Sequence, residues 1–163
     1  MGCVGEGLSC REQQVSICAK DSSGPYDYEM TGELIALAKS NGIDYAVVDL
    51  PGSYSLSAGS QEEVVTTSYI RSGKADLVAI LVDSSQLERS LYMLADFIGT
   101  RIPAVLILNL MDVAEQKGVK IDTAKLSARL GIPVIGFVAA DHKRYPALKA
   151  QLADAAAKKQ LLR

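Results

Sequence analysis

The sequence has no tryptophan, and among its 163 residues it has only two phenylalanines, one histidine and three cysteines. Aromatic residues make up 6% of the chain, so its core must be built mainly from aliphatic side chains. The cysteines, at positions 3, 10 and 18, form no C-x-x-C pair and lie far from the histidine, His142. That spacing disfavours a metal centre, and an odd number of unpatterned cysteines is typical of a reducing compartment.

The sequence also lacks long apolar runs and clusters of basic residues. None of its apolar stretches approaches the roughly 20 residues that a membrane-spanning helix needs. The first residues show neither the basic region nor the apolar core of a signal peptide. The net charge is -2 with both signs interspersed, whereas a nucleic-acid-binding surface needs a basic patch. We therefore expect a cytoplasmic protein with no transmembrane segment in this chain and no nucleic-acid partner.

Short apolar runs rich in β-branched residues alternate with helical patterns along most of the chain. We predict a polar, glycine-rich leader over residues 1–13 and a single α/β domain over residues 14–163. Asp122 and Gly131 are the expected cap and stop of one helix. The expected strands cover residues 14–19, 44–49, 77–82, 103–108 and 133–138, and the expected helices cover 28–40, 62–72, 87–99, 123–130 and 145–162. This alternation predicts a three-layer α/β fold with a mostly parallel sheet.

The expected strand at residues 44–49 ends abruptly in Asp49-Leu50-Pro51-Gly52. Pro51 cannot donate to a strand ladder, and Gly52 allows the backbone to approach a ligand closely. A carboxylate at the end of a buried strand can hold Mg²⁺ through water, and a following glycine amide can meet a terminal phosphate. Asp49 is therefore the candidate metal ligand, although four such residues also describe an ordinary turn.

A second polar signature, Asn109-Leu110-Met111-Asp112, follows the expected strand at residues 103–108. A carboxylate such as Asp112 can accept hydrogen bonds from both N1–H and the 2-amino group of guanine. Adenine has no such pair of donors, so the carboxylate selects guanine. The Asn109 amide can bond the other edge of the base and tie neighbouring loops together. By itself N-x-x-D also fits a surface turn, but its place about 60 residues after D-x-x-G makes the pair more specific.

From about residue 44 to residue 136 the chain resembles the amino-terminal G domain of the FeoB-type ferrous iron transporter. The resemblance rests on three runs and covers more than half of the chain. These runs are D-L-P-G-S-Y-S-L-S from Asp49, L-E-R-S-L-Y from Leu87, and N-L-M-D-V-A-E from Asn109.

The resemblance implies a P-loop-NTPase-like G-domain fold that binds GTP or GDP with Mg²⁺. It implies a cytosolic module whose nucleotide state controls iron passage through a membrane domain, the expected partner. Asp49, Leu50, Pro51 and Gly52 would belong to the phosphate-sensing motif, and Asn109, Leu110, Met111 and Asp112 to the base-reading motif. Val138-Ala139-Ala140 stands where the family has Ser-Ala-Lys or Ser-Ala-Arg, and only the middle alanine matches.

The first 43 residues depart from the family pattern, because they contain no phosphate-binding loop of the form G-x-x-x-x-G-K-[ST]. Two registers come nearest. Residues 2–9 keep both glycines and the serine but have Leu8 for lysine. Residues 19–26, which follow a candidate strand, keep Gly24 and have Pro25 for lysine. We favour this second register, which implies that the usual second strand and first switch are missing from an abnormal front part.

The missing lysine separates two functional hypotheses. The first is a guanine-nucleotide-binding G domain with weak or absent GTP hydrolysis, and we assign no catalytic residue to it. The second is a non-catalytic pseudo-GTPase that acts as an interaction or regulatory module. An ATPase with a deviant phosphate loop is a third idea, and N-L-M-D argues against it because that motif suits guanine.

Overall fold

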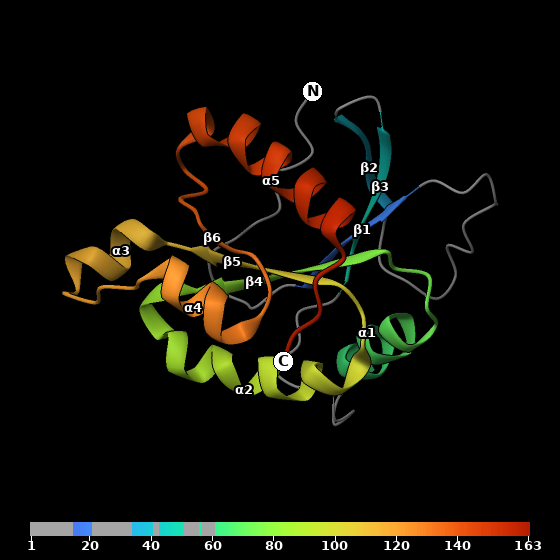
Figure 1. The fold of residues 1–163 in the computed structure, drawn as a ribbon, viewed down its shortest axis with the longest axis horizontal. Coiled ribbons are helices and arrows are strands. Elements are labelled where there is room, and N and C mark those ends of the chain that lie inside the picture. The colour runs from blue at the N-terminus through green and yellow to red at the C-terminus, as the bar shows by residue number, and fades with distance from the viewer. Residues whose placement is uncertain (1–14, 21–33, 41–42, 51–55, 57–60) are drawn as a thin grey trace.

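The computed structural model describes residues 15–20, 34–40, 43–50, 56 and 61–163. These residues build one six-stranded sheet with helices on both of its faces (Figure 1). The predicted leader at residues 1–13 and the phosphate-loop register at residues 2–9 lie outside the described residues. The strands are β1 (Val15–Lys20), β2 (Leu34–Ser40), β3 (Ile43–Asp49), β4 (Leu77–Asp83), β5 (Ala104–Asn109) and β6 (Val134–Gly136).

The strand order across the sheet is β2-β3-β1-β4-β5-β6. β4, β5 and β6 pair in parallel, with Val78 opposite Ala104 and Leu106 opposite Val134. β1 pairs antiparallel with both β3 and β4, so β3 runs in the same direction as β4, β5 and β6. Four of the six strands therefore share one direction, and the mostly parallel three-layer α/β fold is confirmed.

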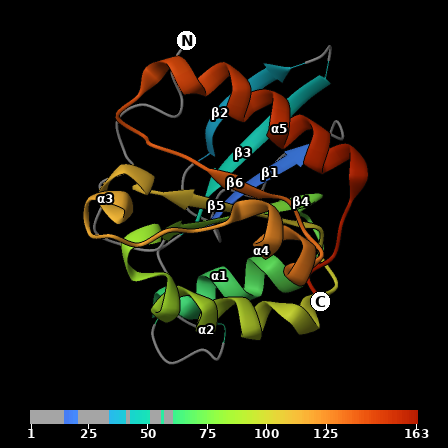
Figure 2. The same cartoon turned by 60° about the vertical axis from the view of Figure 1, so that its left-hand side comes forward.

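Alternate residues of the central strands enter two separate cores. Val78, Ile80 and Val82 of β4 pack under one layer of helices, while Leu77 and Ala79 pack under another. This two-sided burial explains why these strands read as continuous apolar runs. α1 (Gln61–Arg71), α2 (Leu87–Phe97) and α4 (Thr123–Leu130) cover the first face, and α5 (Tyr145–Lys158) covers the second, as Figure 2 shows from the side.

The expected helices from residue 61 onward are present. Asp122 caps α4 by accepting the Lys125 N–H at 2.9 Å, and Gly131 ends the helix with φ of +74°. The remaining helical segments are the short helix α3 (Met111–Gln116) and the 3₁₀ turns η1 (Ser84–Gln86), η2 (Ile98–Thr100) and η3 (His142–Arg144). Across the described part of the chain, every helix is too short or too polar to cross a bilayer.

The front part differs from the sequence prediction in two ways. Residues 34–40, predicted to be helical, form strand β2, which pairs with β3 from Leu34–Val48 to Ser40–Ile43. The second strand that was expected to be missing is therefore present. In addition, β1 runs against β3 and β4, and its carboxyl end at Lys20 lies opposite Tyr45, near the start of β3. The favoured phosphate-loop register at residues 19–26 thus begins at the wrong edge of the sheet.

Candidate functional site

Asn109 is the last residue of β5, and a sharp turn of the chain follows it. Asn109 is only 6% exposed. The next residue, Leu110, has φ of +60° and ψ of +35°, a left-handed conformation that a residue with a Cβ seldom adopts. This turn lets α3 begin at Met111 directly after the strand, so Asp112 lies in the first turn of α3 with its side chain exposed.

Three hydrogen bonds join the end of β5 to the loop that follows β6. The Asn109 Oδ1 atom accepts the Ala139 N–H at 3.1 Å. The Phe137 N–H donates to the Leu108 carbonyl at 2.8 Å, and the Phe137 carbonyl accepts the Met111 N–H at 3.3 Å. The structure therefore brings residues 109–112 and 138–140 together.

The loop after β6 has no polar side chain at residues 138–140, so its shape depends on backbone hydrogen bonds. The Val138 carbonyl accepts the Asp141 N–H at 2.9 Å, which closes a tight turn before α5. Val138 and Ala139 are half-buried, and Ala140 is exposed. The turn thus leaves Ala140 exposed, next to Ala139, which Asn109 holds.

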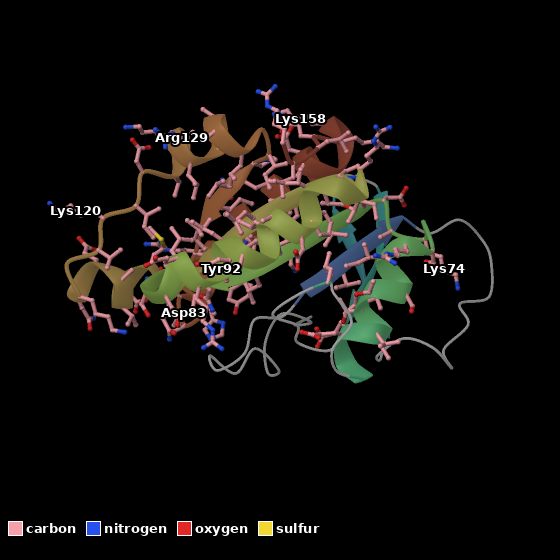
Figure 3. The ribbon with its side chains drawn as sticks, turned by 90° about the horizontal axis from the view of Figure 1, so that it is seen from below. Lys74, Asp83, Tyr92, Lys120, Arg129 and Lys158 are labelled. Carbon is pink, nitrogen blue, oxygen red and sulfur yellow. The ribbon has the colours of Figure 1, made fainter. Side chains whose placement is uncertain are left out.

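The end of β4 supplies a further acidic residue beside this pair of loops. Asp83 lies opposite Asn109 in the sheet, and its Oδ1 atom accepts the Ser85 N–H at 2.8 Å to start η1. Lys117, which follows α3, donates to Ser85 Oγ at 3.2 Å and ties α3 to η1. In Figure 3, Asp83 lies toward the same end of the molecule as Lys120, whereas Lys74 lies at the other end.

Asp49 ends β3 in a partly buried position. Its Oδ1 atom is buried and has no hydrogen-bond partner among the described residues. Burial raises the pKa of the Asp49 carboxyl because desolvation disfavours the charged form. Leu50 is buried in the core, so only its backbone could face a ligand. Pro51 and Gly52, the other two residues of the predicted motif, lie outside the described residues.

The sheet register separates Asp49 from the base-side residues. Ser16 of β1 pairs with Asp49 on one side and with Ala79 on the other, so Asp49 is level with Ala79. Asp83, opposite Asn109, lies four residues further along β4, a step of about 13 Å at 3.3 Å per residue. The predicted site residues therefore form two groups, Asp49 on one side and residues 109–112 with 138–140 on the other.

Sequence reasoning missed two polar groups near this edge of the sheet. The Tyr145 hydroxyl donates to the Ala139 carbonyl at 2.9 Å, although the sequence marked Tyr145 only as the start of a helix. Ser84 is fully buried, and its Oγ atom has no hydrogen-bond partner among the described residues. Serine directly after Asp83 at a strand end was the available signal for Ser84, whereas no local pattern identified Tyr145.

The fold is an α/β domain that gathers polar residues at the carboxyl ends of parallel strands, the edge at which such domains bind ligands. A family profile described as ferrous iron transport protein B matches residues 30–152, which include β2 to β6 but not β1. The chain belongs to this family.

Known relatives agree with this family. The Fe(2+) transporters FeoB of Escherichia coli K12 and Salmonella typhimurium are each 44% identical to the chain over 107 residues. The match covers 63% of this chain and 14% of each transporter, so the chain corresponds to a small part of these relatives.

Solved structures of similar fold are G domains and cytosolic domains of FeoB. The FeoB G domain of Methanococcus jannaschii is 38% identical with a TM-score of 0.71, over 74% of this chain and 77% of that one. The cytosolic domain of T. maritima FeoB in a GDP form is 32% identical with a TM-score of 0.71, over 78% of this chain and 50% of that one. Its GMPPNP form gives a TM-score of 0.69 at 32% identity, over 74% and 49%.

Proposed function

We propose that this chain is a guanine-nucleotide-binding G domain of ferrous iron transporter type, with weak or absent GTP hydrolysis. The observation that carries the proposal is the Asn109 side chain, which bonds the Ala139 N–H and holds two loops at the carboxyl edge of the sheet. Open α/β sheets bind ligands at this edge.

The base would lie between the start of α3 and the loop at residues 138–140. Asp112, exposed in the first turn of α3, would accept hydrogen bonds from N1–H and the 2-amino group of guanine. The Asn109 amide would bond the opposite edge of the base. Leu110 and Met111 would position these two side chains, because the left-handed turn at Leu110 starts α3 at Met111.

The phosphates and a Mg²⁺ ion would lie nearer Asp49. Mg²⁺ prefers oxygen ligands, and the buried Asp49 Oδ1 atom without a described partner is a suitable one. The bound ion would supply charge neutralisation for the phosphates. The offset of about 13 Å between Asp49 and the base-side residues, from the strand rise, suits a ligand with two separately recognised ends, such as GDP or GTP.

Weak hydrolysis follows from the front part of the chain. A phosphate-binding loop connects a strand to a helix and cradles phosphates with its glycine amides and lysine. The sequence contains no such motif within these 163 residues, and β1 carries its carboxyl end away from Asp49. The chain would therefore lack the lysine that neutralises the transferred phosphoryl group.

The relatives indicate the cellular setting. The T. maritima structures are described as cytosolic domains of the FeoB iron transporter, in GDP and GMPPNP forms. By this relationship we infer a cytoplasmic location for the present chain. Its partner would be a membrane iron-transport domain or another component of the transporter.

Titration of a fluorescent guanosine diphosphate in the presence of Mg²⁺ tests this function. We expect micromolar binding to the unsubstituted chain, and an affinity at least tenfold lower for Asp112→Asn. Xanthosine diphosphate should bind Asp112→Asn better than the unsubstituted chain, because its 2-oxo group accepts from the new amide. Glu115→Gln is the matched control, since Glu115 is an exposed carboxylate three residues later in α3.

The second candidate function is a pseudo-GTPase that acts as an interaction module. The reversed direction of β1 favours it, since that strand cannot deliver a loop to the carboxyl edge. No binding of GDP or GTP at high micromolar concentration, with the chain shown to be folded, would support the pseudo-GTPase and overturn nucleotide binding.

A further inference from the structure

We propose that Tyr145 is a positioning residue that holds the base-reading loop at residues 138–140 in its binding shape. This inference rests on the proposed function, because the loop is taken to contact the guanine base. Tyr145 is the first residue of α5, and its hydroxyl donates to the Ala139 carbonyl at 2.9 Å.

Ala139 is held from both sides. Its N–H donates to Asn109 Oδ1 at 3.1 Å, and its carbonyl accepts from the Tyr145 hydroxyl at 2.9 Å. The first bond anchors the loop to the end of β5, and the second anchors it to α5. Residues 138–140 have no polar side chains of their own, so they cannot make side-chain hydrogen bonds within the loop. The bonds from Asn109 and Tyr145 hold the loop instead.

The Tyr145 ring is itself fixed by two aromatic neighbours. It packs edge-to-face against Phe137, with ring centroids 5.3 Å apart and an angle of 89° between the planes. The His142 ring stacks on it at 5.4 Å with an interplanar angle of 18°. Phe137 is buried, so the ring is attached to the core between the sheet and α5. A hydroxyl on such a ring can hold the loop with little freedom of movement.

The bond to the Ala139 carbonyl also orients the next amide. In a trans peptide the carbonyl and the following N–H point in opposite directions. The Ala140 N–H must therefore point away from Tyr145. The geometry makes this N–H the donor for the ring carbonyl oxygen of guanine, whereas Asp112 reads the N1–H and 2-amino edge.

Tyr145→Phe is the informative variant, because it removes the hydroxyl and keeps the ring that packs on Phe137. Tyr92→Phe is the control, since it removes the same hydroxyl from an exposed tyrosine of α2, outside the loop. Two measurements distinguish the effect of the hydroxyl on the loop from its effect on base recognition. Amide hydrogen exchange at Ala139, whose N–H donates to Asn109, reports the loop alone in the nucleotide-free chain. The dissociation rates of fluorescent GDP and of inosine diphosphate report base recognition.

For Tyr145→Phe we expect exchange of the Ala139 amide and dissociation of GDP each to become roughly fivefold faster, the effect of one lost hydrogen bond. The ratio of GDP to inosine diphosphate affinity should stay constant, because both bases carry the ring carbonyl. Asp112→Asn should instead reduce that ratio, because only guanine has the 2-amino group. Tyr92→Phe should leave both rates within about twofold of the unsubstituted chain, since it breaks no hydrogen bond to the loop.

Unchanged amide exchange in Tyr145→Phe would overturn the proposal, and so would a fall in the ratio of GDP to inosine diphosphate affinity. A melting temperature of the nucleotide-free variant close to that of the unsubstituted chain would exclude general destabilisation as the cause. If the unsubstituted chain bound no nucleotide, the proposed function would fail. The exchange at Ala139 would still decide whether Tyr145 holds the loop.

Discussion

The back half of the domain, residues 61–163, and the front half, residues 15–49, differ in the direction in which their strands pair. In the back half, β4, β5 and β6 are parallel neighbours, and each is joined to the next through a helix. In the front half, β1, β2 and β3 pair only in the antiparallel sense with one another and with β4. Both halves belong to one sheet, and the ladder between β1 and β4 joins the antiparallel strands of the front half to the parallel strands of the back half.

The directions of the strands explain why the candidate site residues lie at one edge of the sheet. Parallel strands bring all their carboxyl ends to one edge, so Asp83 and Asn109 lie opposite each other. An antiparallel strand sends its following loop to the other edge. The central slot between β3 and β4 is occupied by β1, which lies before the residues that match the family. β1 therefore carries the chain away from the carboxyl edge, at which a nucleotide would bind.

The largest expected loss of stability comes from the core of the back half. Leu106, in the middle of β5, is fully buried between β4 and β6. We expect Leu106→Ala to reduce the free energy of unfolding by about 3 kcal/mol, through lost burial and the cavity left behind. Val119→Ala is the control, because Val119 is 39% exposed and should change stability by less than about 0.5 kcal/mol. Urea unfolding measures both, and equal losses would contradict the assigned core.

A proline in β1 tests whether the two halves unfold together. Ile17 pairs with Val48 of β3 and Val78 of β4, and proline would remove its N–H and clash within the ladder. We expect Ile17→Pro to cost roughly 2–3 kcal/mol, with amide protection lost in β2 and β3 and kept in β5 and β6.

Hydrogen exchange measured strand by strand checks this pattern. Ile17→Val is the control, because it keeps the N–H and a β-branched side chain. Uniform loss of protection across all six strands would show that the front and back halves form one cooperative unit. The two halves would then differ in strand direction but not in stability.

The back half was largely predictable because its signals are local. Apolar runs at residues 77–82 and 103–108 gave the strands, and Asp122 with Gly131 gave the ends of α4. The buried face of α2 could not be predicted in this way, since Leu91, Ala95 and Ile98 are exposed while Leu94 and Phe97 are buried. Leucine and alanine placed at helical spacing on two adjoining faces cannot show which face meets the sheet.

The strands at residues 14–19 and 44–49 of the front half were predicted, whereas residues 34–40 were mispredicted because pairing partners, and not local preference, decide their structure. Residues 34–40 carry leucine, alanine and lysine, which favour helices, yet they pair with β3 across a two-residue connection. Asn41-Gly42 at that connection is a strong hairpin signal that the helical interpretation overlooked. The direction of β1 has no signature within residues 15–20. Likewise, the bond from Tyr145 to Ala139 depends on how α5 meets the loop and not on either residue type.

The smallest expected effect concerns Asp49, at the end of the front half. Burial raises the pKa of its carboxyl, so the folded chain binds this proton more tightly than the unfolded chain does. Stability therefore falls as pH rises from the unfolded value, near 4, through the raised folded value. At pH 7 the buried charge opposes folding. We expect Asp49→Asn to raise the melting temperature of the nucleotide-free chain by a few degrees at pH 7.

The difference between Asp49→Asn and the unsubstituted chain should shrink as pH falls toward 3.5, because both side chains are then neutral. Asp154→Asn is the matched control, since this exposed carboxylate pairs with Lys158 at 2.7 Å on the surface of α5 and contributes little. Mg²⁺ with GDP should reverse the order, by stabilising the unsubstituted chain and not Asp49→Asn. A variant less stable than the unsubstituted chain at pH 7 without ligand would mean that the carboxylate has a stabilising partner. Asp49 would then be part of the framework that joins the front half to the back half, and the phosphate end of the site would need another ligand.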